Sequence, residues 1–333
     1  MDTLHPRDSF TLEGAEAPEG AFLKSLARGR LHHAWLLTGP EGIGKASFAY
    51  RAARRLLGAA PDPAHGLLGA SPEDPVSRQV SARSHPDLLV LEREVPDGKP
   101  RKFIPVDEAR RLPEFFSKAP ASAAHRVAIV DAADDLNPSA ANALLKTLEE
   151  PPPNGVLFLV SHAPGRLIGT IRSRCRRLAF RSWEPQQVVD FLRPRVSVGE
   201  EDALRLAVMS RGAPGRALAL AHSGALEADR EARRLLSELP RTDAAALQAL
   251  ADSLRGSEGQ ARLELLMERL ADNIREMTQR TAADAPDPAL ERWAEAWETL
   301  VNLPAQAEAL NLDRQDAFWT AMGRLQRAAR APC

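Results

Sequence analysis

The sequence predicts an α/β protein, in which a phosphate-loop domain with a parallel sheet is followed by a small helical lid and a C-terminal helical domain. Three observations predict this fold class. Short apolar runs alternate with helical patterns, a glycine-rich loop joins the first run to a helical pattern, and no strand pattern follows Pro185. A chain of 333 residues is also too long to fold around one small hydrophobic core, which predicts several domains.

Five apolar runs have the length of buried strands. They are Trp35 to Thr38, Asp87 to Leu91, Val127 to Asp131, Val156 to Val160 and Leu178 to Phe180. Because helical patterns separate these runs, we expect parallel strands covered by helices on both faces. The clearest helix follows Asn137 and Pro138, which suit the N-cap and the first helical position, and it ends before Pro151.

The remaining segments predict loops and a helical second half. Residues 58–86 are rich in Gly, Pro, Ala and Ser and predict an irregular insertion, held by apolar packing or partly loose. The sequence Asp-Gly-Lys-Pro at 97–100 predicts a turn. After Trp183 the chain reads as helix interrupted by Gly and Pro. We therefore predict three domains, at 1–182, 183–224 and 225–333.

Composition narrows the classes of function. The chain is 44% hydrophobic and 27% charged, as in ordinary globular proteins, and its net charge of −1 limits any nucleic-acid contact to a local patch. Its two cysteines, Cys175 and Cys333, cannot form a four-cysteine zinc site or a disulfide framework, so no metal site is expected. With so few cysteines the sequence predicts a protein of the reducing cytoplasm, and the lack of an apolar leader or of a run of 18 apolar residues indicates no membrane role.

The glycine-rich loop fits the pattern GxxxxGK at Gly39, Gly44 and Lys45. Such loops direct backbone amides at phosphate oxygens, while a Ser or Thr after the lysine binds Mg²⁺. Here Ala46 stands at that position, and Ser47 is turned about 100° further around the helix. The loop predicts binding of ATP or ADP with weak or no Mg²⁺, and an ordinary glycine-rich turn is the alternative. The predicted contacts are Gly39, Gly42, Gly44, Lys45, Ala46 and Ser47.

A second candidate site follows the strand that ends at Asp131. Its carboxylate would lie beside the phosphate loop, where it can hold Mg²⁺ directly or through water. P-loop ATPases of this shape commonly have Glu next, but this chain has Ala132. Asp134 and Asp135 lie beyond the strand and are expected to cap the next segment or to face solvent. Without the hydroxyl and the base, little ATP turnover is expected.

Three further motifs resemble the clamp-loader branch of the AAA+ ATPases. They are NALLKTLEEPP at Asn142 to Pro152, VLFLVSH at Val156 to His162, and Ser173-Arg174-Cys175. Within this branch the chain looks most like delta-prime subunits of the bacterial DNA polymerase III clamp loader, because the gamma/tau motors carry Ser or Thr at Ala46 and Glu at Ala132. The stretches Ser84 to Leu88 and Arg211 to Leu218 also resemble delta-prime proteins. The four-cysteine zinc module of many relatives is missing from residues 58–83.

The resemblance implies roles for several residues. Arg174 would enter the nucleotide site of a neighbouring subunit as an arginine finger, Arg216 would be the second sensor, and Ser161 or His162 the first. The C-terminal helices, with Trp293, Trp297 and Trp319, would form a collar. Implied partners are the gamma/tau motor and delta subunits, the sliding clamp, and primed DNA through the complex. Polymerase activity would belong to the holoenzyme alone.

Other interpretations stay open from the sequence. Arg172, Arg174, Arg176 and Arg177 could form only a solvated basic edge, and Cys175 is expected to be a small apolar side chain rather than a nucleophile. His32 and His33 have no partners at metal-binding spacing and are expected to be structural or to lie near the adenine. Alternative functions are a gamma/tau motor, a nucleotide kinase, and an assembly scaffold.

Overall fold

The structure is a computed structural model that describes residues 5–93, 103–281 and 288–330. The described chain divides into two compact units. The first reaches to Ser197 and includes Ser210–Leu218, and the second consists of Val198–Met209 and the residues from Ala219 onward. The predicted turn at 97–100 and Cys333 lie outside the described residues.

A five-stranded sheet forms the centre of the first unit. The strands lie in the order β2-β3-β4-β1-β5, and every pairing is parallel. Their bounds are β1 Ala34–Thr38, β2 Leu88–Glu92, β3 Arg126–Asp131, β4 Gly155–Ser161 and β5 Arg176–Ala179. The predicted α/β class is therefore confirmed. The fifth strand begins at Arg176 rather than Leu178, because it is an edge strand whose first two side chains are exposed arginines.

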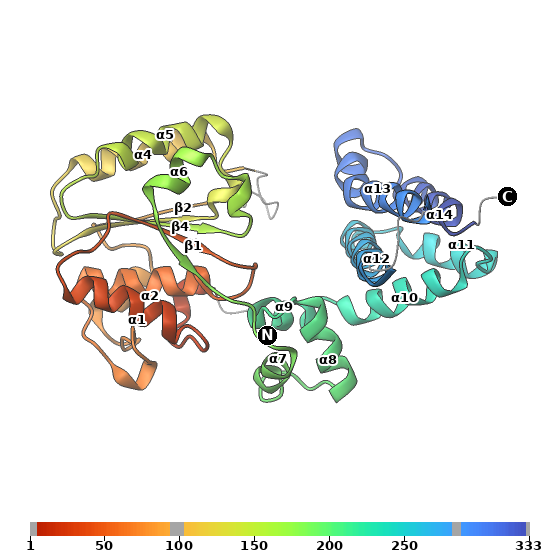
Figure 1. The fold of residues 1–333 in the computed structure, drawn as a ribbon, viewed down its shortest axis with the longest axis horizontal. Helices are drawn as coiled ribbons and strands as arrows, with labels where there is room; N and C mark the ends of the chain where they lie inside the picture. Colours follow the sequence, from red (N-terminus) through yellow and green to blue (C-terminus); the bar gives the residue numbers. More distant parts are fainter. Residues whose placement is uncertain (1–4, 94–102, 282–287, 331–333) are drawn as a thin grey trace. The chain divides into compact units, whose positions relative to one another are not determined.

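Helices cover both faces of this sheet (Figure 1). One face packs on α1 (Glu16–Ala27) and α2 (Lys45–Leu57), and the other on α4 (Val106–Ser117), α5 (Pro138–Glu149) and α6 (Gly169–Arg174). Alternate side chains of β1 enter the two cores: Trp35 and Leu37 pack with α2, while Ala34 and Leu36 pack with α4 and α5. Short 3₁₀ turns lie between these elements, at η1 Pro6–Asp8, η2 Pro63–His65, η4 Ala133–Asp135 and η5 Pro164–Arg166.

The helix predicted after Asn137 is α5. The side chain of Asn137 accepts a hydrogen bond from the amide of Ala140 at 2.8 Å, and Pro138 occupies the first helical turn. Its last helical residue is Glu149, just before Glu150 and the prolines. The predicted cap, start and end of this helix are confirmed.

The insertion after α2 is more ordered than its composition indicates. It contains α3 (Pro75–Ser81), whose first turn is capped by the carboxylate of Asp74. Leu68 and Val80 are buried in the core between the sheet and helices α1 and α2. A buried ion pair holds the segment as well, because Arg51 bonds to Glu19 at 2.9 Å and also donates to the carbonyl of His65 at 2.8 Å. Apolar packing and this ion pair together hold the insertion in place.

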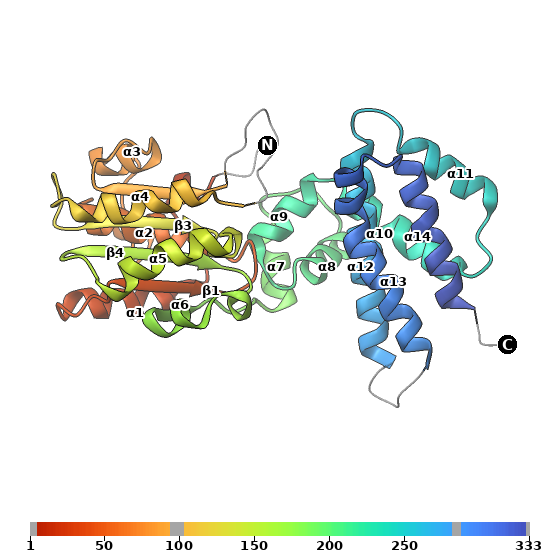
Figure 2. The same ribbon diagram turned by 90° about the horizontal axis from the view of Figure 1, so that it is seen from above.

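All regular secondary structure in the described residues after β5 is helical. The segment predicted as a lid contains α7 (Pro185–Leu192), α8 (Glu200–Met209) and α9 (Pro214–His222). The second unit continues with α10 Ala225–Glu238, α11 Ala244–Ser253, α12 Gly259–Thr281, α13 Pro288–Leu310 and α14 Arg314–Ala329, drawn in Figure 2. Its apolar core includes Met267, Leu270 and Phe318. None of the described helices is both long and apolar enough to span a membrane.

Candidate functional site

A glycine-rich loop joins β1 to α2 at the carboxyl edge of the sheet. Gly39, Gly42 and Gly44 have positive φ angles of 149°, 75° and 98°, a conformation that other residues rarely adopt. Gly44 is the N-cap of α2, and no side-chain hydrogen bond caps this end of the helix. An uncapped helix N-terminus beside a glycine-rich loop is suited to bind phosphate oxygens.

The start of α9 packs directly on this loop. The amide of Gly215 donates a hydrogen bond to the carbonyl of Gly42 at 2.9 Å. A Cβ atom added to Gly42 would clash with the backbone of Arg216, and one added to Gly215 would lie 2.7 Å from the carbonyl oxygen of Gly42. The fold therefore brings the backbone of Arg216 to the phosphate loop, across more than 170 residues of sequence.

Lys45 is the first residue of α2, and only 3% of it is exposed. Its ammonium donates hydrogen bonds to the carbonyls of Gly39 at 2.7 Å and Pro40 at 2.5 Å. Burial lowers the pKa of Lys45 to about 8, and the nearby carboxylates of Asp131 and Glu41 oppose this shift. A phosphate in the loop would take the place of these two carbonyls as partner of the ammonium.

Asp131 ends β3 within electrostatic range of Lys45. Burial, followed by repulsion from Glu92, raises the pKa of Asp131 to about 6, while Lys45 acts in the opposite direction. The next residue, Ala132, is buried and presents only a methyl group. The strand end therefore carries a carboxylate beside the loop, but it has no acid–base side chain at the position after it.

Ala46 and Ser47 follow Lys45 in the first turn of α2. Ala46 packs against the apolar core between the sheet and helices α1 and α2. Its methyl group cannot bind the metal that a Ser or Thr binds at this position. The loop residues therefore fit a phosphate group, but they do not fit the Mg²⁺ of an active P-loop ATPase.

The end of β4 is held by a carboxylate from η4. Asp134 accepts hydrogen bonds from the hydroxyl of Ser161 at 2.9 Å and from the amides of His162 and Ala163 at 2.5 and 3.2 Å. Asp135 pairs with Arg93 at 3.0 Å. The expectation that these aspartates cap the next helix is wrong, because Asn137 supplies the cap of α5. Both aspartates are partly exposed, and their carboxylates bind other elements.

Arg174 is the last residue of α6 and lies away from the loop. It directly precedes the segment of β5 that pairs with Trp35, so it lies near the amino edge of the sheet, whereas the loop follows the carboxyl end of β1. Its side chain is 37% exposed and pairs with Glu149 at 3.0 Å. It also donates to the carbonyl of Thr170 at 3.3 Å. Arg174 therefore faces outward and does not serve the loop of its own chain.

The remaining candidates have structural surroundings. Cys175 packs against the core between the sheet and helices α4, α5 and α6. Burial raises the pKa of its thiol to about 12, so Cys175 is not a thiolate nucleophile at neutral pH. The rings of His32 and His33 stack at 4.4 Å, and the Nδ1 atom of His32 lies 2.8 Å from the carbonyl oxygen of Ala34. They lie before β1, at the edge of the sheet opposite the phosphate loop.

Two partners of the site were not predictable from the motifs. Glu149 binds Arg174 from the end of α5, and Asp134 binds the end of β4. Both pairs join segments that are far apart in sequence, and neither carboxylate follows a spacing rule that would identify it. The close packing of Gly215 on Gly42 has a clearer signal, since Gly215 lies in a glycine- and proline-rich motif.

Comparison with known proteins agrees with these features. The family model described as DNA polymerase III, delta subunit matches residues 16–184, just over half of the chain. DNA polymerase III subunit delta' of Pseudomonas aeruginosa is 42% identical over 143 residues, which cover 43% of this chain and 41% of that protein. The Escherichia coli K12 subunit delta' is 36% identical over 197 residues, covering 59% of this chain and 56% of the relative.

A gamma/tau subunit matches over a longer stretch with lower identity. The Mycobacterium tuberculosis H37Rv protein is 29% identical over 320 residues, which cover 87% of this chain and 54% of the relative. The chain thus spans about half the length of the curated relatives it matches. The family match and the delta' relatives show that the chain belongs to the delta-prime family of DNA polymerase III clamp-loader subunits.

Proposed function

We propose that this chain is a clamp-loader subunit that hydrolyses little or no ATP itself and supplies Arg174 to the nucleotide site of a neighbouring motor subunit. The observation that carries the proposal is the position of Arg174, which is exposed near the amino edge of the sheet, opposite its own phosphate loop. A guanidinium at a neighbour's site would stabilise the charge that develops on the transferred phosphoryl group.

The phosphate loop supports the same division of labour. Gly39 to Lys45 would bind the phosphates of ATP or ADP through backbone amides and the ammonium of Lys45. Ala46 and Ala132 supply neither a ligand for Mg²⁺ nor a general base. The loop would therefore bind a nucleotide without cleaving it.

The proposed partners follow from the family. They are a gamma/tau motor and a delta subunit, with the sliding clamp and primed DNA reached through the assembled complex. The three domains predicted at 1–182, 183–224 and 225–333 would then be a nucleotide-binding domain, a lid and a collar. Such a complex would work on the chromosome in the bacterial cytoplasm.

The test is reconstitution with motor and delta subunits, followed by DNA-stimulated ATPase and clamp-loading assays. Arg174→Ala should lower turnover at the adjoining motor site by about 10³ or more while leaving assembly intact. Arg166→Ala, at an exposed arginine of η5 near the carboxyl end of β4, is the control. Unchanged clamp loading by Arg174→Ala would instead favour a pure assembly scaffold.

The motor alternative requires a separate measurement. Steady-state ATP hydrolysis by the isolated chain distinguishes the two, because a gamma/tau-type motor carries its own catalytic groups. We expect turnover near the background of uncatalysed hydrolysis. Turnover at the rate of a motor subunit would overturn the assignment.

A further inference from the structure

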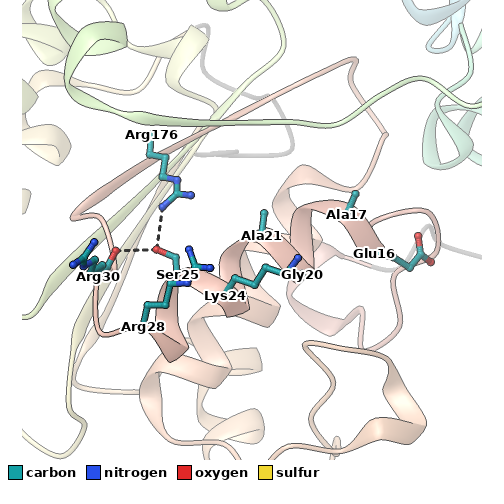
Figure 3. A pocket seen from close by; sticks show the side chains of 9 residues that line it. All are labelled: Glu16, Ala17, Gly20, Ala21, Lys24, Ser25, Arg28, Arg30 and Arg176. Atoms are coloured by element: carbon teal, nitrogen blue, oxygen red, sulfur yellow. Dashed lines mark hydrogen bonds between the residues drawn. The ribbon is translucent and has the colours of Figure 1, made fainter.

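A basic pocket lies beside α1 at a second place in the first unit (Figure 3). It has a volume of about 500 Å³. Its walls come from three segments: the exposed side of α1, the connection from α1 to β1, and the first residue of β5. The lining residues are Glu16, Ala17, Gly20, Ala21, Lys24, Ser25, Arg28, Arg30 and Arg176.

The pocket is separate from the phosphate loop. Arg176 pairs with Trp35 near the amino end of β1, while the phosphate loop follows Thr38 at the carboxyl end. Arg28 and Arg30 lie in the connection that leads into the same amino end. The pocket therefore lies at the opposite edge of the sheet and cannot be part of the nucleotide site of this chain.

The lining carries a local excess of positive charge. Lys24, Arg28, Arg30 and Arg176 contribute four cations, and Glu16 contributes the single carboxylate. None of these four cations forms an ion pair with any carboxylate among the residues that the structure describes. The cluster stands out in a chain whose net charge is −1. Concentrated positive charge in a concave site attracts polyanions.

Part of the pocket is already ordered. Ser25 is only 5% exposed, and its hydroxyl donates to the carbonyl of Arg30 at 2.9 Å while accepting from Nη1 of Arg176 at 3.1 Å. The guanidinium of Arg176 also lies over the buried ring of Trp35, at 4.9 Å from its centre. These contacts fix one guanidinium and the backbone of another arginine, which lowers the entropy lost when a ligand binds.

The floor of the pocket indicates the chemistry of the ligand. Ala17, Gly20 and Ala21 leave the surface of α1 open, and a Cβ atom on Gly20 would meet no atom within 4 Å. The lining has no large apolar side chain that would anchor a peptide. Arginine is well suited to phosphate, because its guanidinium can donate two parallel hydrogen bonds to phosphate oxygens. The surface is therefore better suited to a phosphodiester backbone than to an acidic protein segment.

We propose that this pocket binds phosphate groups of a nucleic-acid backbone. The inference goes beyond the proposed function, since a subunit can complete a neighbour's nucleotide site without touching DNA itself. The contact is not specific for base sequence, because the lining offers charges and small side chains but no side chain arranged to read base edges.

The first test measures binding of the full chain to a fluorescent duplex with a single-stranded extension, over a series of salt concentrations. The double variant Arg28→Gln/Arg30→Gln should weaken binding at low salt about tenfold and reduce the slope of log K against log salt by about two. The control Arg110→Gln/Arg111→Gln removes two exposed arginines of α4, which pair with Asp107 and Glu108, and should change neither quantity.

A second pair of variants tests the same pocket without removing an arginine. Gly20→Glu places a carboxylate over the open floor and should weaken DNA binding about as strongly as the arginine double variant. Gly20→Gln has nearly the same shape without the charge and should weaken it much less. Both variants replace a glycine inside a helix, so neither should impair folding.

Three outcomes would overturn the inference. The first is that the wild-type chain shows no salt-dependent binding to DNA. The second is that Arg28→Gln/Arg30→Gln binds DNA as well as its control Arg110→Gln/Arg111→Gln does. The third is that Arg28→Gln/Arg30→Gln weakens the binding of poly-glutamate but not that of DNA. The last result would assign the pocket to an acidic protein surface. Because these measurements use the chain without its partners, they are independent of the role proposed for Arg174.

Discussion

Arg174 and Glu149 form an ion pair of 3.0 Å between the last residues of α6 and α5. The guanidinium is 37% exposed and the carboxylate 50% exposed, so the pair contributes little to stability. The proposed contact of Arg174 with a phosphate of a neighbouring subunit requires the guanidinium to leave Glu149. Each pair of this kind is worth at most about 1 kcal/mol, which corresponds to about a fivefold change in the population of the released arginine.

Glu149→Gln should therefore raise the ATPase rate of the reconstituted complex by about two- to fivefold in the absence of DNA. The stability of the isolated chain should change by less than about 1 kcal/mol. Glu150→Gln, at the exposed neighbouring residue, serves as the control. A lower rate for Glu149→Gln would show that the carboxylate positions the guanidinium rather than restrains it.

Ala46→Ser should make nucleotide binding depend on Mg²⁺. The new hydroxyl would supply the metal ligand that the loop lacks, so ADP affinity should rise about tenfold on adding Mg²⁺, whereas wild-type affinity should hardly respond. Isothermal titration with Mg²⁺ or with a chelator measures the difference. Ser47→Ala should behave like wild type. A strong Mg²⁺ response of the wild-type chain would contradict this explanation of Ala46.

Glu19→Ala should destabilise the first unit strongly. The carboxylate pairs with Arg51 in the interior, and its removal leaves a buried guanidinium without its counter-charge, at a cost of about 3 to 5 kcal/mol. Urea unfolding followed by far-ultraviolet circular dichroism measures the change. Glu13→Ala breaks the exposed pair with Arg195 and should cost less than about 1 kcal/mol. Equal effects would mean that the buried pair is dispensable.

The pKa of Asp131 predicts a pH dependence of stability. The folded chain holds the proton more tightly, with a pKa of about 6 against an ordinary value of 3.8. The folded state thus binds more protons than the unfolded state between these values, and stability falls as pH rises through this window, by up to about 3 kcal/mol. Asp131→Asn removes this term, so the variant should gain stability relative to wild type between about pH 4 and pH 6. If the difference in the free energy of unfolding between the variant and wild type stays constant across that range, Asp131 does not cause the pH dependence.

The sheet was largely predictable because its three central strands are buried on both faces. β1, β3 and β4 are continuous apolar runs, and apolar runs with helices between them leave little choice other than a parallel sheet. The start of β5 was missed because Arg176 and Arg177 belong to an exposed edge strand and carry no apolar signal. Helix α3 was missed although Asp74 and Pro75 form a good N-terminal signal, because the composition around them favours loops.

The candidate site was predictable only as far as local motifs extend. The phosphate loop needs glycines at fixed spacing, so the positive φ angles of Gly39, Gly42 and Gly44 follow from the sequence. The partners of Arg174 and Ser161 do not, because any nearby carboxylate can satisfy an arginine or a hydroxyl, and only the tertiary fold selects Glu149 and Asp134. The basic pocket was also not predictable, since its cations come from three separate segments.

The hydrogen bond between Ser161 and Asp134 has a consequence for nucleotide discrimination. A serine hydroxyl has one hydrogen, and Ser161 donates it to a carboxylate that cannot donate in return. While this bond holds, the hydroxyl cannot also donate to the terminal phosphate of a bound nucleotide, so Ser161 would give the chain no means of distinguishing a triphosphate from a diphosphate. The same carboxylate also accepts from the amides of His162 and Ala163, so a single side chain of η4 ties down the end of β4.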